Sequence, residues 1–118
     1  MAQLATHTIH QVPATPVIDL GHLAHMTLGD RSLEREVLQL FDRQAELLLA
    51  RMRSGAPPAI GALAHTLRGS ASGIGADHVA QAAQAVEQAG NAERLAAMDA
   101  LDAAIVEARA AIAELLHD

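Results

Sequence analysis

One histidine and the residues one helical turn away from it form the part of this sequence whose types and spacing could do chemistry. Residues 64–76 read AHTLRGSASGIGA, in which His65 is followed by Arg68 and Gly69. Residues three or four positions apart are neighbours on a helix, so the cation and the glycine would lie beside the imidazole. A neutral imidazole has a ring nitrogen with a free lone pair, and arginine can bind phosphoryl oxygens. The pattern predicts a phosphoryl acceptor at His65, with Arg68 stabilising the arriving charge.

Small residues on the same side of the expected helix indicate a surface that another protein approaches. Gly61 precedes His65 by four positions, Gly69 follows it by four, and Ser72 lies one further turn along. A glycine inside a helix costs about 1 kcal/mol relative to alanine, so two exposed glycines call for a reason. We predict that Gly61, Gly69 and Ser72 leave room for a docking partner. Close packing between helices is the alternative explanation for the glycines.

A helix that begins at Pro57 and ends near Gly75 would carry these residues. Prolines suit the first helical turn, and a glycine in the left-handed conformation commonly follows the last one. At 100° per residue, His65 lies about 160° from the centre of the apolar stripe and faces solvent. The stripe consists of Ile60, Leu63, Leu67, Ala71 and Ile74.

Four further helices are expected from apolar periodicity. Asp19 can cap a short helix that stops near Gly29, and Ser32 or Asp30 can cap a long helix that runs to about Arg53. The last two helices are expected over about 77–89 and 92–116. The residues expected to face inward are Leu20, Leu23, Ala24, Leu33, Val37, Leu40, Phe41, Leu47, Leu48, Met52, Val79, Ala82, Ala83, Val86, Met98, Leu101, Ile105, Ala108, Ile112 and Leu115.

These elements predict an all-α fold: an antiparallel up-down four-helix bundle with a short N-terminal helix capping one end. Residues 1–17 are polar and contain Pro13 and Pro16, so we expect a flexible N-terminal arm there and a single domain over 18–118. The alanine-rich seam of the last helix fills its own bundle, which favours a monomer.

The composition argues against several classes of function. The chain of 118 residues has a formal charge of −6, no lysine, no basic run and a single aromatic residue, so nucleic acid is not an expected ligand. No apolar stretch approaches the roughly 20 residues that span a bilayer. Residues 1–16 lack the basic start and apolar core of a secretory signal. We therefore expect a cytoplasmic protein that binds neither nucleic acid nor a membrane.

The histidines and carboxylates outside this segment do not predict a metal site, and cysteine is absent. Two pairs have the i, i+3 spacing of weak metal sites but no matching cysteine or carboxylate, namely His7 with His10 and His22 with His25. Glu114 and His117 have a spacing used in di-iron bundles, which need two copies of it and two further glutamates. We expect no metal, no cofactor, and an ordinary surface role for His78.

The segment AHTLRGSASGIGA resembles the signature of histidine-containing phosphotransfer (HPt) domains. In that signature the histidine is followed by Thr-Leu-Lys-Gly, small residues and a second glycine ten positions on. Arg68 stands where the family usually has lysine, which keeps the charge but replaces a point charge with a planar fork. The likeness spans about residues 18–115, and only its His65–Gly75 part is specific. The residues that carry it are His65, Thr66, Leu67, Arg68, Gly69, Ser70, Ala71 and Gly75, with Leu40-Phe41 and Val86-Glu87 as looser matches in neighbouring helices.

The resemblance implies a bundle that relays phosphoryl groups between aspartates of response-regulator receiver domains, including the receivers of hybrid histidine kinases. By this likeness His65 is phosphorylated on its outward ring nitrogen, and Gly69 permits the receiver to dock. No segment resembles an ATP-binding domain, so we expect a phosphoryl carrier rather than a kinase. The alternative function is a docking or inhibitory module that binds a receiver or a kinase through the same face without being phosphorylated. A metal-binding bundle is a third hypothesis.

Overall fold

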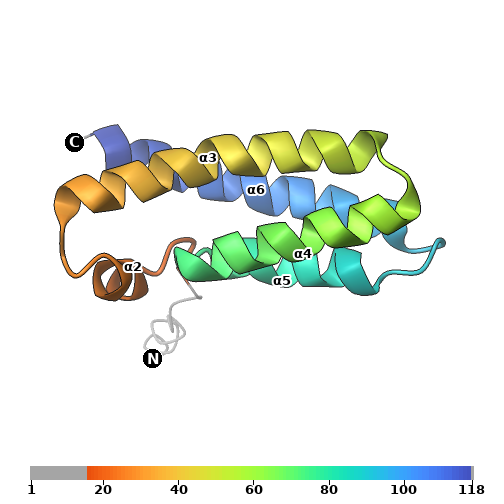
Figure 1. The fold of residues 1–118 in the computed structure, drawn as a ribbon, viewed down its shortest axis with the longest axis horizontal. Coiled ribbons are helices and arrows are strands. Elements are labelled where there is room, and N and C mark those ends of the chain that lie inside the picture. The colour runs from red at the N-terminus through yellow and green to blue at the C-terminus, as the bar shows by residue number, and fades with distance from the viewer. Residues whose placement is uncertain (1–15, 118) are drawn as a thin grey trace, which may run out of the picture.

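The computed structural model describes residues 16–117, which form five helices and, within that range, no strand. The four long helices run alternately in opposite directions, and the short helix α2 closes one end of the bundle (Figure 1). The predicted all-α bundle with a capping helix is confirmed. Most of the predicted arm, with His7 and His10, lies outside the described residues. The helices are α2 (Leu20–Met26), α3 (Arg31–Ser54), α4 (Pro57–Gly73), α5 (Asp77–Gln88) and α6 (Arg94–His117).

Two aspartates determine where α2 and α3 begin. The carboxylate of Asp19 accepts a hydrogen bond from the backbone N–H of His22 at 3.0 Å, and that of Asp30 accepts one from Leu33 at 3.0 Å. These bonds satisfy N–H groups that have no partner within the first helical turn. Of the two residues considered for the cap of α3, it is therefore Asp30, and not Ser32, that serves.

A sharp turn after α4 attaches α2 to the end of that helix. Gly75 has a φ of +79°, in the left-handed region that the sequence predicts. A Cβ at this position would lie 2.9 Å from the carbonyl oxygen of Asp19, and the Asp19 N–H donates to the Gly75 carbonyl at 2.9 Å. Only glycine fits this contact without strain. Gly75 thus ends α4 and also holds the start of α2 against the bundle.

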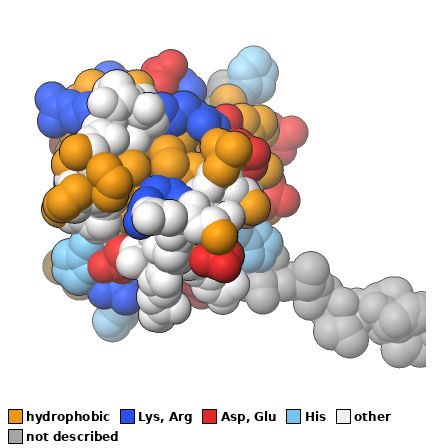
Figure 2. All heavy atoms as spheres, turned by 90° about the vertical axis from the view of Figure 1, so that its right-hand side faces the viewer, with side chains coloured by type: hydrophobic (Ala, Val, Ile, Leu, Met, Phe, Trp, Pro, Cys, Tyr) orange, Lys and Arg blue, Asp and Glu red, His pale blue; other side chains and the backbone are white. Residues whose placement is uncertain are grey.

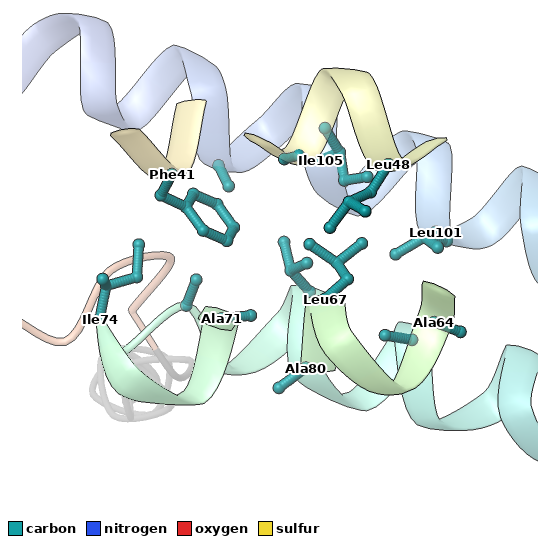
Figure 3. Close-up of a cluster of buried hydrophobic side chains, with 14 of the residues drawn as sticks. Phe41, Leu48, Ala64, Leu67, Ala71, Ile74, Ala80, Leu101 and Ile105 are labelled. Atoms are coloured by element: carbon teal, nitrogen blue, oxygen red, sulfur yellow. The ribbon is translucent and has the colours of Figure 1, made fainter. Parts of the chain in front are cut away.

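The core runs along the middle of the bundle, and alanine makes up much of it (Figure 3). Each of α4 and α6 contacts both α3 and α5. Small buried side chains let the helices approach closely, while larger ones fill the remaining space. Most residues predicted to face inward from α4, α5 and α6 are buried, and Leu63, Ala82 and Leu115 are partly buried. The residues labelled in Figure 3 are Phe41, Leu48, Ala64, Leu67, Ala71, Ile74, Ala80, Leu101 and Ile105.

The predicted core face of α3 is partly wrong. Three leucines expected to face inward are instead 40–57% exposed, namely Leu33, Leu40 and Leu47. Leu38 and Ala45 lie in the core instead, beside Phe41. Helix α3 carries apolar residues on two adjacent stripes, and only the packing of α4 and α6 decides which stripe is covered. In α2, Leu20 is likewise exposed rather than buried.

Arginines link α3 to α6 on the outside of the bundle. Arg53 Nη2 donates to Asp102 at 3.0 Å, and Arg109 Nε donates to Asp42 at 2.8 Å. The hydrogen bond that Arg109 donates to Asp42 raises the pKa of the guanidinium. All four side chains are at least 30% exposed, so each pair contributes at most about 1 kcal/mol to stability. Figure 2 shows the end of the bundle where α3 leads into α4, with arginine and acidic side chains among hydrophobic ones.

None of the helices in the described part of the chain combines the length and the apolar character that a membrane span requires.

Candidate functional site

His65 lies on the exposed face of α4, as its position in the sequence predicts. The opposite face of this helix is buried and includes Ala64, Leu67 and Ala71. The His65 side chain is 64% exposed. The imidazole is therefore open to another macromolecule, while the backbone that carries it is fixed by the core.

Glu87 of α5 holds one nitrogen of the His65 ring. Its Oε2 lies 2.8 Å from His65 Nδ1. A carboxylate can only accept a hydrogen bond, so the contact places the ring proton on Nδ1. The lone pair of the neutral ring is then on Nε2. The Glu87 side chain is only 21% exposed, and this partly desolvated setting strengthens its hold on the ring.

Arg68 completes a cluster of three residues. Its Nη2 lies 3.2 Å from His65 Nδ1, and its Nε lies 3.3 Å from Glu87 Oε1. Arginine can only donate, so with the ring proton on Nδ1 the guanidinium lies beside that nitrogen without a hydrogen bond to it. Glu87 Oε1 is buried and has no hydrogen-bond partner among the described residues, so the approach of Nε is an ion pair without hydrogen-bond geometry. The guanidinium is therefore held to Glu87 mainly by charge.

The surface of α4 around His65 is open at both glycines. A Cβ added to Gly61 or to Gly69 would meet no atom within 4 Å. Close helix packing within the described chain therefore does not explain either glycine. At Gly75, by contrast, a Cβ would collide with the backbone of Asp19.

A groove of about 490 Å³ runs between α4 and α5 beside the cluster. It brings together three of the predicted site residues and adds polar side chains from α5 that the sequence did not single out. Neither His65 nor Gly61 lines this groove. The lining includes Arg68, Gly69 and Ser72 from α4 and Asp77, Gln81 and Gln84 from α5.

Glu87 is the site residue that the sequence reasoning missed. The sequence places it in the Val86-Glu87 pair that resembles the family pattern and predicts no role for it. Its contact with His65 joins residues 22 positions apart and depends on how α4 packs against α5. One signal was available, since an acid directly after the buried Val86 lies at the edge of the apolar face of α5.

A second histidine forms a similar pair without the surrounding cluster. His78 Nδ1 lies 3.1 Å from Glu107 Oε1 of α6, and both side chains are at least 32% exposed. Within residues 16–117 no arginine forms an ion pair with Glu107. In the same range, no group of three or more histidine or acidic side chains is placed to hold a metal ion.

Comparison with known proteins identifies the family to which the chain belongs. A family model described as the Hpt domain matches residues 32–117, which include His65, Arg68 and Glu87. Comparisons with curated proteins and with solved structures give no match. The family match covers most of the chain and all four long helices except the first residue of α3. The chain belongs to the Hpt domain family, whose function is histidine phosphotransfer in two-component signalling.

Proposed function

We propose that this protein is a phosphorelay intermediate. His65 accepts a phosphoryl group from the aspartate of a receiver domain, either free or part of a hybrid histidine kinase, and passes it to the aspartate of another receiver. The observation that carries this proposal is the exposed imidazole of His65, with its inner nitrogen bonded to Glu87 and the Arg68 guanidinium beside it.

The transfer step follows from the position of the ring proton. The Nε2 lone pair attacks the phosphorus of the aspartyl phosphate, an N–P bond forms, and the P–O bond to the aspartate breaks to release its carboxylate. The proton stays on Nδ1, so the ring gains positive charge as the bond forms. The Glu87 carboxylate stabilises that charge through the hydrogen bond it already accepts. In the onward step the second aspartate attacks the phosphorus, and the imidazole leaves in its neutral form.

Arg68 and Gly69 support this step in different ways. The guanidinium of Arg68 lies 3.2 Å from the ring, close enough to bond the equatorial oxygens of a phosphoryl group on Nε2. Gly69 leaves the approach to Nε2 open, because no side chain projects from the next turn of α4. Gly61 and Ser72 continue this surface on either side of the imidazole, because neither carries a large side chain.

The test is phosphoryl transfer from a panel of phosphorylated, isotopically labelled receiver domains to the full chain. The variant His65→Gln removes the acceptor. The matched control is His78→Gln, because His78 also lies beside a glutamate on a neighbouring helix but has no arginine paired with that glutamate. We expect acid-labile, base-stable label on the wild type and on His78→Gln, and none on His65→Gln.

Two results would contradict the proposal. Label on His65→Gln would place the acceptor elsewhere. Binding of receivers without transfer to the folded wild type, in an assay where another phosphotransfer protein is active, would favour a docking or inhibitory module that uses the same face.

A further inference from the structure

Three leucines lie along one side of α3, and the rest of the described chain covers them only in part. Leu33, Leu40 and Leu47 are 40%, 57% and 51% exposed, and they are seven positions apart. Val37 and Gln44 lie between them, so the spacing alternates four and three, as in a coiled-coil seam. We call these five residues the α3 seam.

The α3 seam lies beside the covered face of its helix. Phe41 and Leu48 face the core, whereas the seam borders a shallow groove of about 170 Å³ between α3, α4 and the end of α2. The lining of this groove is almost entirely apolar and includes Met26, Val37, Leu40, Phe41 and Ile74. A line of leucines next to an apolar groove is a surface of the kind that is usually buried by a partner.

Two unpaired charges follow the outer edge of the α3 seam. Glu36 and Arg43 are both exposed, lie seven positions apart and flank the same side of the leucines. Neither forms an ion pair within residues 16–117. If a second α3 lies antiparallel to the first, with Val37 opposite Leu40 of the partner subunit, then Glu36 lies opposite Arg43 of the partner subunit. The two-fold axis repeats this ion pair. A parallel arrangement leaves both charges without a partner, since the residues that would face Glu36 and Arg43 across the seam are Phe41 and Leu48.

We propose that this protein forms an antiparallel homodimer through the α3 seam. The occupant is a second copy, because one face offers both the heptad spacing and the self-complementary charges that a two-fold contact needs. The proposal does not depend on phosphotransfer at His65. It replaces the expectation of a monomer, which rested on the interior of the bundle and not on its outer surface.

The test is sedimentation of the full chain over a range of concentrations that extends to high micromolar. We expect the wild type to approach twice the chain mass of 12.3 kDa as the concentration rises. Leu40→Glu should remain monomeric at every concentration. The control Leu95→Glu should dimerise like the wild type, because Leu95 is 69% exposed on α6, away from the α3 seam.

Charge reversal tests the arrangement of the two copies. Glu36→Arg and Arg43→Glu should each weaken association about tenfold, because each places like charges opposite one another twice in the dimer. The double variant Glu36→Arg/Arg43→Glu should recover the wild-type affinity. Far-ultraviolet circular dichroism and urea unfolding confirm that each variant is folded.

A wild type that stays monomeric at all concentrations would overturn the proposal. Double reversal that fails to restore association would overturn the antiparallel arrangement. If the wild type is monomeric and Leu40→Glu lowers phosphoryl transfer from a receiver, the α3 seam is instead a surface for receiver docking.

Discussion

The carboxylate of Glu87 lies 2.8 Å from Nδ1 of His65 and thereby joins the middle of α4 to the end of α5. In Glu87→Gln the amide can donate to Nδ1 instead, which favours the tautomer that carries its proton on Nε2. We expect the rate of phosphoryl transfer to fall about tenfold, equivalent to about 1.4 kcal/mol in the barrier. Single-turnover transfer kinetics measure the loss.

A purely structural role for Glu87 would leave the ring tautomer unchanged. Nitrogen-15 chemical shifts of the His65 ring distinguish the two cases, because they report which nitrogen carries the proton. Glu107→Gln is the matched control, since Glu107 makes the same kind of contact with His78. Equal transfer rates in Glu87→Gln and Glu107→Gln would remove Glu87 from the mechanism.

Arg68 is expected to act through its charge more than through its shape. The guanidinium approaches Glu87 without a directed hydrogen bond, so Arg68→Lys should keep most of the transfer rate, while Arg68→Gln should lose about tenfold. Unfolding in urea should change by less than about 1 kcal/mol in both variants, because the pair is exposed in part. Transfer rates that are the same in Arg68→Gln and the wild type would show that another group stabilises the phosphoryl charge.

Substitutions at Gly69 should separate stability from access. Since a Cβ there meets no atom within 4 Å, Gly69→Ala should raise the free energy of unfolding by about 0.5–1 kcal/mol. It should lower transfer only slightly, because a methyl group narrows the approach to the imidazole much less than a large side chain does. Gly69→Trp should keep the fold but block transfer, because the indole would occupy the approach to Nε2. Urea unfolding and the receiver assay measure the two effects. Normal transfer by Gly69→Trp would mean that receivers approach from another side.

The same change at Gly75 should have the opposite effect on stability. Gly75 has a φ of +79°, and a Cβ would lie 2.9 Å from the carbonyl oxygen of Asp19. We expect Gly75→Ala to lower the free energy of unfolding by about 2 kcal/mol or more, from the left-handed backbone and the collision together. Urea unfolding beside Gly69→Ala provides the comparison. A neutral Gly75→Ala would show that α2 shifts away from the end of α4 at little cost.

Features that depend on neighbouring residues in the chain could be predicted from the sequence. The caps at Asp19 and Asp30, the prolines that open α4 and the left-handed Gly75 follow from local backbone chemistry, and the structure contains each of them. The exposure of His65 also followed, because a single helix wheel places it opposite the apolar stripe.

Features that depend on how helices meet could not be predicted in the same way. The choice between two apolar stripes on α3 is made by α4 and α6, so Leu40 was expected inside and lies outside. The pairing of His65 with Glu87 requires the relative rotation of α4 and α5, which no local pattern encodes. The roles of the site residues remain predictions that the experiments above test.

The contact between Asp19 and Gly75 also determines where the chain can be cut when the domain is fused to another protein. The family match begins at residue 32, yet Ile18, Leu23 and Thr27 are buried, and the Asp19 backbone lies against the turn that ends the helix of His65. A fragment that begins at residue 32 would expose that turn to solvent and would lack part of the core. Fusion to another protein should therefore retain the chain from residue 16 onward, so that the junction precedes α2.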